Sequence, residues 1–307
     1  MGGVIQRHSR LVAVVAVYVL LWGGAVGVLA AARSDAVGDA VVVFVIFGVV
    51  FSAIGWLTTL GRAAGAIAVR RPGLEAALVL AYLAAYAVLF TGFGLNAFHA
   101  AFAPGRSEAI LLVAFKLVVH VALPALVLLA AGARLAPLFA GRPVGRAFWL
   151  SLAVLAAAIL TVISVISPSL KQIAALGLSP GSLALTAGGA FAWIAIEAGL
   201  CEEFLFRAVL QTRLAAIMRT ELGAVLIAAL LFGLVHVPGL WMRASSSDAG
   251  HSQSLIEVVA YAVAVLSPAG VFLGFMWYRT KNLLLVMLLH ALIDVLPFIP
   301  QFARLWL

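Results

Sequence analysis

Charged residues are scarce in this sequence. Asp, Glu, Lys and Arg make up 10% of its 307 residues, whereas 65% of the residues are hydrophobic. A soluble domain has to cover its surface with polar side chains, so a chain with so few of them is not a soluble globular protein. Lipid solvates the outer surface of spanning helices, and the composition therefore predicts an integral membrane protein with the lipid bilayer as its surroundings.

Acidic residues and cysteine are rarer still. The chain has 11 Asp and Glu against 19 Lys and Arg, a formal net charge of +8. The basic residues stand mostly in short loops between apolar runs, where they serve topology and contact lipid headgroups, so we expect no nucleic-acid partner. Cys201 is the single cysteine and excludes an intrachain disulfide. It could act as a nucleophile beside two glutamates, but we favour a small apolar packing residue.

Apolar runs of spanning length recur along the whole chain. Each approaches the ~20 residues that a helix needs to cross a bilayer, and backbone polar groups in lipid require helical hydrogen bonding. The sequence therefore predicts an all-α, polytopic transmembrane helix bundle with about eight to nine membrane helices. The first run is too long for a signal peptide and is expected to remain as a span. The predicted spans are Leu11–Ala31, Val41–Leu60, Leu74–Leu95, Ile110–Leu129, Phe148–Ile166, Leu183–Leu200, Leu222–Leu240, Leu255–Tyr278 and Leu283–Ile299.

The distribution of Lys and Arg predicts the orientation of the bundle. With a cytoplasmic N-terminus, the inner segments hold Arg7, Arg10, Arg62, Arg70, Arg71, Arg134, Arg142, Arg146, Arg207, Arg213, Arg219, Arg279 and Lys281. The outer segments then hold only Arg33, Arg106, Lys171, Arg243 and Arg304. This excess favours a cytoplasmic N-terminus under the positive-inside rule. The composition, rich in Ala, Val and Arg, suggests a bacterial gene, so the expected location is the bacterial inner membrane.

Ionisable residues inside spans need a reason, because each is costly to insert, and here they gather in the C-terminal third. On a helix, Glu203 and Arg207 are four residues apart and can pair, whereas Glu202 projects about 100° away and remains available as a base. The number of residues between Glu202 and the turn at 219–221 is nearly the same as the number between the turn and His236. In an antiparallel helix pair the two side chains therefore meet at one level.

A third pair, His290 and Asp294, shares one face of the last span, where the carboxylate can orient the imidazole. The order of these residues resembles the CAAX-protease and bacteriocin-processing (CPBP) family, which includes the type II CAAX prenyl proteases. The family pattern is two glutamates, three residues and arginine; phenylalanine, three residues and histidine; then histidine, three residues and asparagine or aspartate. The matching residues here are Glu202, Glu203, Arg207, Phe232, His236, His290 and Asp294.

The resemblance implies a role for each motif residue. Glu202 would activate water, His236 would hold that water and shuttle its proton, and His290 with Asp294 would stabilise the oxyanion. Glu203, Arg207 and Phe232 would support the site. Asp294 stands where the prenyl proteases carry asparagine, and a carboxylate would instead keep His290 cationic. The resemblance also predicts that residues 183–307 form a catalytic helical core. Residues 1–182 would then form about five N-terminal spans.

The family is often described as metalloproteases, and the Glu, His and Asp set could bind zinc. No His-Glu-x-x-His motif is present, so we favour a mechanism that requires no cofactor and leave zinc open. Other ionisable residues have two interpretations. Lys116 and His120 lie four residues apart and are either a substrate contact or, as we favour, a polar link between helices. Glu197 lines the cavity or satisfies a neighbouring helix.

The leading functional hypothesis is an intramembrane endopeptidase acting on a membrane-associated protein or peptide. A non-proteolytic membrane scaffold or regulator that retains the protease fold is the alternative. A proton-coupled carrier would also use Glu, His and Asp, but the sequence lacks the paired halves typical of carriers.

Overall fold

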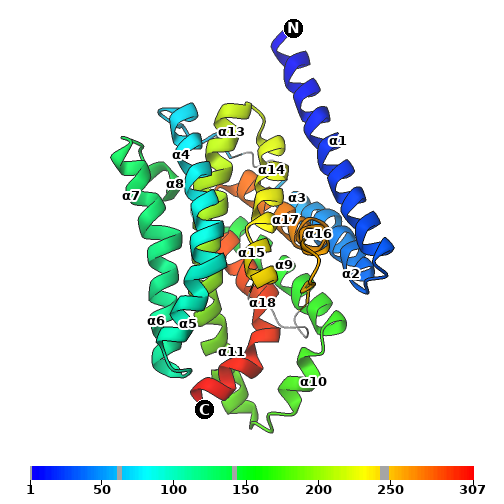
Figure 1. Ribbon diagram of the computed structural model, residues 1–307, viewed down its shortest axis with the longest axis vertical. Coiled ribbons are helices and arrows are strands. Elements are labelled where there is room, and N and C mark those ends of the chain that lie inside the picture. Colours follow the sequence, from blue (N-terminus) through cyan, green and yellow to red (C-terminus); the bar gives the residue numbers. More distant parts are fainter. Residues whose placement is uncertain (1, 61–63, 140–143, 243–248) are drawn as a thin grey trace.

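The structure is a computed structural model that describes residues 2–60, 64–139, 144–242 and 249–307. Within these ranges the chain forms helices and connecting turns without a strand, and nine helices are long and apolar enough to cross a membrane. This confirms the predicted all-α bundle of an integral membrane protein (Figure 1). The nine spans are Ser9–Ala31, Ala36–Thr58, Pro72–Ala101, Arg106–Ala130, Arg146–Ile166, Pro180–Met218, Glu221–Met242, Leu255–Thr280 and Leu283–Trp306.

Three spans are single α-helices, namely α1 (Gly2–Ala31), α9 (Arg146–Ile166) and α18 (Leu283–Trp306). Five of the other spans join successive α-helical and π-helical (η) segments, and the seventh joins two α-helices. These are α2 (Ala36–Val43), η1 (Phe44–Phe51) and α3 (Ser52–Thr58); α4 (Pro72–Ala85), η2 (Tyr86–Gly94) and α5 (Leu95–Ala101); α6 (Arg106–Leu117), η3 (Val118–Ala122) and α7 (Leu123–Ala130); α11 (Pro180–Ile194), η4 (Ala195–Leu200), α12 (Cys201–Glu203), η5 (Phe204–Gln211) and α13 (Thr212–Met218); α14 (Glu221–Leu234) and α15 (Val237–Met242); and α16 (Leu255–Tyr261), η6 (Ala262–Leu266) and α17 (Ser267–Thr280). Short helices α8 (Ala136–Phe139) and α10 (Ser169–Ala174) lie in connections.

The sixth span differs from its prediction. The apolar run predicts a span that ends at Leu200, and the partly apolar stretch after it, with Glu203 and Arg207 on a helix before the turn at 219–221, could lie inside the membrane. The helix instead continues to Met218. Burial of the Glu203–Arg207 ion pair explains the difference, since paired charges can be accommodated inside a bundle.

The turn between the sixth and seventh spans lies where the sequence predicts it. Arg219 ends α13 with a left-handed backbone (φ 56°), and the Thr220 side chain then accepts the Gly223 N–H to begin α14. The chain reverses within these residues, so η5 and α14 run antiparallel and carry their motif residues side by side.

Helix α17 packs closely against this pair. A Cβ atom at Gly270 would lie 3.1 Å from Ala229 Cα, and one at Gly274 would lie 2.8 Å from Gln211 Oε1. Both glycines therefore allow close helix packing. Arg207 and Gln211 in turn donate to the Gly270 and Gly274 carbonyl oxygens, at 3.4 and 2.9 Å, which fixes α17 beside η5.

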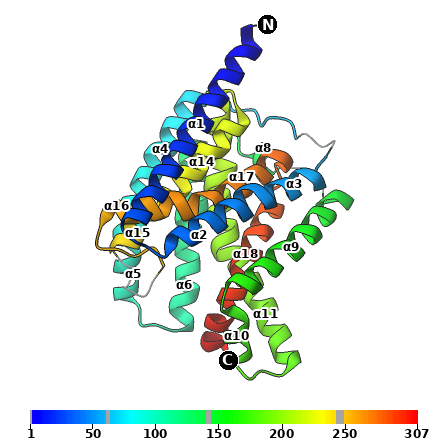
Figure 2. The ribbon, with the colours of Figure 1, turned by 90° about the vertical axis from the view of Figure 1, so that its right-hand side faces the viewer.

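Helices α14, α17 and α18 form the buried centre, whereas α1 stands at the edge of the bundle (Figures 1 and 2). The α13–α14 turn and the start of α4 lie at the same end as the N-terminus, and α10 and the C-terminus lie at the opposite end (Figure 1). Which end faces the cytoplasm stays a prediction, as does a domain division at residue 182. Of the arginines used for orientation, Arg62, Arg142 and Arg243 lie outside the described residues.

Candidate active site

The two glutamates of the first motif lie within the long sixth helix, between its π-helical segments η4 and η5. Glu203 is fully buried, and its Oε1 lies 3.0 Å from Arg207 Nη1. The contact predicted from their spacing is therefore present. The Arg207 guanidinium also stacks on the Phe232 ring, 4.6 Å from its centroid. Glu202 points away from this pair, and its side chain is 17% exposed.

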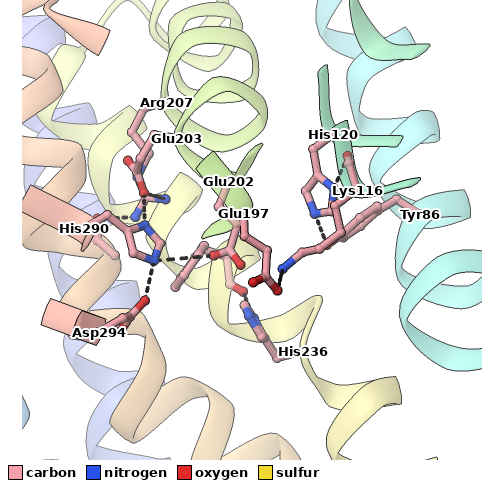
Figure 3. A network of polar contacts seen from close by, with 12 residues as sticks. Tyr86, Lys116, His120, Glu197, Glu202, Glu203, Arg207, His236, His290 and Asp294 are labelled. Atoms are coloured by element: carbon pink, nitrogen blue, oxygen red, sulfur yellow. Dashed lines mark hydrogen bonds and ion pairs between the residues drawn. The ribbon is translucent and has the colours of Figure 1, made fainter. Parts of the chain in front are cut away.

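His290, from α18, meets both glutamates (Figure 3). Its Nδ1 lies 2.7 Å from Glu203 Oε1. Its Nε2 lies 3.2 Å from Asp294 Oδ2 and 3.9 Å from Glu202 Oε2. The pairing of His290 with Asp294 agrees with the i,i+4 prediction. The contact with Glu203 was not predicted, because the sequence pattern paired this glutamate only with Arg207.

His236 completes the group from the end of α14. Its Nδ1 lies 2.7 Å from the Phe232 carbonyl oxygen, which can only accept, so Nδ1 carries the proton and Nε2 is a free acceptor. The Phe232 ring packs edge-on against the imidazole, with 5.0 Å between centroids. Figure 3 shows the His236 imidazole beside Glu202, as the antiparallel arrangement predicted. Phe232 thus contacts both His236 and Arg207.

A second polar cluster adjoins Glu202 on the side away from His290 (Figure 3). Lys116 Nζ lies 3.2 Å from Glu197 Oε1, and Trp193 donates its indole N–H to Glu197 Oε2 at 2.7 Å. His120 donates from Nδ1 to the Lys116 carbonyl oxygen at 2.8 Å, and its Nε2 accepts the Tyr86 hydroxyl at 2.9 Å. The sequence singled out Lys116, His120 and Glu197, but only as helix links or cavity lining. Their separation in the chain concealed the Lys116–Glu197 pair.

Cys201 is a packing residue, as favoured from the sequence. It is fully buried and neighbours Glu202 without reaching the exposed part of the site. Zinc needs at least three protein ligands at about 2.0–2.3 Å. Among the described residues no three His, Cys, Asp or Glu side chains are placed to hold a metal ion. Both His290 nitrogens already face carboxylates, so the residues as arranged do not fit a zinc site.

Comparison with known protein families agrees with this geometry. Residues 184–296 match the family described as Rce1-like, type II CAAX prenyl endopeptidase. Over this segment the chain is similar to the Rce1-like family. The segment contains all seven motif residues, and the resemblance inferred from their order is confirmed. Neither a curated protein nor a solved structure matches the chain.

The nine apolar helices of the described residues, together with this similarity to a CAAX-type protease family over residues 184–296, indicate an integral membrane protein. The Rce1-like segment brings a carboxylate, two imidazoles and a second carboxylate together from three different spans. Such a group supplies a proton acceptor and a potential oxyanion partner within one site, which suits hydrolysis of an acyl bond.

Proposed function

We propose that the protein is an intramembrane endopeptidase that hydrolyses a peptide bond of a membrane-associated protein or peptide with a glutamate-activated water. The observation that supports this most is the convergence of Glu202, His236 and His290 within the membrane part of the bundle. Glu203 and Asp294 each form an ion pair of 3.2 Å or less, whereas the ion pair of Glu202 with His290 is 3.9 Å long. Glu202 also lies beside the imidazole of His236, whose Nε2 can accept a hydrogen bond.

Glu202 is the general base. A water molecule between its carboxylate and His236 Nε2 loses a proton to Glu202 while its oxygen bonds to the scissile carbonyl carbon, and the carbonyl oxygen becomes an oxyanion. His236 accepts a hydrogen bond from this water and holds it in line. When the C–N bond breaks, His236 carries the proton from Glu202 to the leaving amine, so Glu202 returns to its carboxylate form.

His290 stabilises the oxyanion. Carboxylate oxygens face both of its ring nitrogens, and only a doubly protonated imidazole can donate to both. Its positive charge compensates the negative charge that develops on the substrate oxygen. Asp294 acts through His290, because an ionised carboxylate cannot itself donate to an oxyanion.

Glu203, Arg207 and Phe232 position these groups. Glu203 orients the His290 ring through Nδ1, and Arg207 balances the charge of Glu203 in a fully buried setting. The aromatic ring of Phe232 separates Arg207 from His236 and contacts each of them. These three residues therefore hold the acid–base groups without touching the substrate.

The proposed mechanism requires no metal, since each proposed step uses only side chains of the chain and water. The proposed substrate is membrane-associated, and whether it is prenylated is left open by the residues of the site. We place the protein in the bacterial inner membrane with a cytoplasmic N-terminus, on the distribution of Lys and Arg.

The test compares purified wild type with Glu202→Gln on a library of membrane-anchored peptides in liposomes, with new termini identified by mass spectrometry. Asp39→Asn is the matched control, because it also converts a carboxylate to an amide but lies on α2. New termini with wild type and Asp39→Asn, absent with Glu202→Gln and unchanged by chelator, are expected. Equal cleavage by all three proteins, or loss of cleavage with chelator, would contradict the proposed mechanism.

A further inference from the structure

A cavity of about 400 Å³ lies away from the proposed active site, where several spans end. Span 2 ends at Thr58, span 5 begins at Arg146, span 8 ends at Thr280 and span 9 begins at Leu283. A point at which four apolar spans end together lies at the boundary between hydrocarbon and water. The polar residues that line the cavity are Thr59, Arg146, Ser151, Arg279, Thr280 and Asn282.

The charge of this cavity is of one sign. Arg146 and Arg279 are its two ionisable residues, and none of the described lining residues is acidic. No ion pair among the described residues includes either arginine. Two guanidinium groups at one cavity repel each other unless an anion compensates them. The cavity is therefore suited to a negatively charged ligand.

Arg279 is fixed in place before any ligand binds. Its Nε donates to Thr59 Oγ1 at 3.0 Å, and its Nη2 donates to the Thr59 carbonyl oxygen at 2.8 Å. These two bonds hold the guanidinium at the cavity wall, so its ordering entropy is already lost. Arg146 is exposed and lines the same cavity as the first residue of α9.

The start of α9 adds further donors. Gly145 precedes the helix and has no side chain to bond the first backbone N–H groups. The N-terminus of a helix of 21 residues carries a partial positive charge, which attracts phosphate. Arginine forks bind phosphate oxygens with paired hydrogen bonds, and the hydroxyl of Ser151 suits a remaining oxygen. Taken together, the lining chemistry is that of a phosphate site.

We propose that this cavity binds a phosphate group, supplied by the headgroup of an anionic phospholipid. Its location at the membrane boundary favours a lipid, whose acyl chains can lie along the apolar outer surface of the bundle. Leu285, which lines the cavity, stands five residues before His290 on α18. A bound headgroup would therefore fix the start of the helix that carries part of the proposed active site.

The experiment measures lipid binding to the full-length protein in detergent by native mass spectrometry. Phosphatidylglycerol, phosphatidylcholine with the same acyl chains and inorganic phosphate are titrated against wild type and Arg146→Gln. The matched control is Arg134→Gln, which removes an exposed arginine that does not line the cavity. Arg146 is exposed at the start of its helix, so the variant is expected to fold, which its thermal unfolding verifies.

Wild type and Arg134→Gln are expected to bind phosphatidylglycerol more tightly than phosphatidylcholine. Arg146→Gln is expected to bind phosphatidylglycerol roughly tenfold more weakly, as for the loss of one charge-assisted contact. Inorganic phosphate that binds with the same dependence on Arg146 and displaces the lipid would identify a soluble phosphate as the ligand and support the phosphate site. Equal phosphatidylglycerol binding by all three proteins, or no preference over phosphatidylcholine, would overturn the proposal.

Discussion

Replacing Glu203 by glutamine tests whether one buried carboxylate contributes both to the stability of the protein and to catalysis. Glu203 Oε1 lies 2.7 Å from His290 Nδ1 and 3.0 Å from Arg207 Nη1, and the side chain is fully buried. An amide has the same shape, but it carries no charge. Its NH2 group would also face a hydrogen-bond donor, either the His290 imidazole or the Arg207 guanidinium. Arg207 then remains buried with only the Gly270 carbonyl oxygen and the Phe232 ring as partners.

The expected effect on stability is large. Removing one partner of a buried ion pair costs about 3–5 kcal/mol in the free energy of unfolding. Activity should also fall, because the imidazole of His290 keeps Asp294 but loses the acceptor on Nδ1. The free energy of unfolding in mixed detergent and the rate of peptide cleavage measure the two effects separately.

A double variant distinguishes the contribution of Glu203 to the stability of the fold from its contribution to the orientation of His290. Glu203→Leu with Arg207→Met replaces the ion pair by apolar side chains of similar volume, a change that is often neutral for stability. We expect the double variant to recover the free energy of unfolding to within about 1 kcal/mol of wild type while cleavage stays low. Two results would refute the reasoning: a loss below about 1 kcal/mol with full activity in Glu203→Gln, or recovered cleavage in the double variant.

Three further variants address the remaining parts of the site. His236→Phe should reduce the cleavage rate by about 10²–10⁴-fold, the usual contribution of a positioned proton-transfer group, with little change in thermal unfolding; an active variant would remove His236 from the mechanism. Asp294→Asn should cleave within about tenfold of the wild-type rate, since an amide still accepts a hydrogen bond from His290 and can donate one to the oxyanion. Asp294→Leu should be far less active, and equal rates for both variants would contradict this role. Gly233→Ala should destabilise the protein by about 1–3 kcal/mol, because the new Cβ would lie 2.3 Å from the Ala262 carbonyl oxygen; an unchanged unfolding temperature would show that α14 and η6 can separate without loss.

The nine spans follow from the sequence because length and apolar composition are local properties of a chain. Predicted starts and ends lie within seven residues of the observed ones, with span 9 ending at Trp306 rather than Ile299, except that the sixth helix extends to Met218. The error there has a physical cause. The charges of Glu203 and Arg207 end the apolar run at Leu200, although each is the partner that allows the other to be buried.

The partners of His290 show where prediction from sequence stops. The spacing to Asp294 lies within one helix and follows from its period of 3.6 residues. The contact with Glu203 crosses between two spans and depends on how each rotates about its own axis. That rotation is set by packing, for example where Gly270 and Gly274 bring α17 against the sixth helix. The π-helical segments around Glu202 change the rotation again, and no local pattern identifies them.

The exposure of the polar side chains divides the site into a buried part and an exposed part. The side chains of Asp294, Glu202 and His290 are 40%, 17% and 8% exposed, whereas Glu203 is fully buried. Exposure therefore falls along one direction, from Asp294 on the outer side towards Arg207 in the centre of the bundle. Glu203 already contacts Arg207 and His290, whereas part of the Glu202 side chain is exposed. Two adjacent glutamates on one helix are thus suited to different tasks, because their surroundings differ although their chemistry is the same.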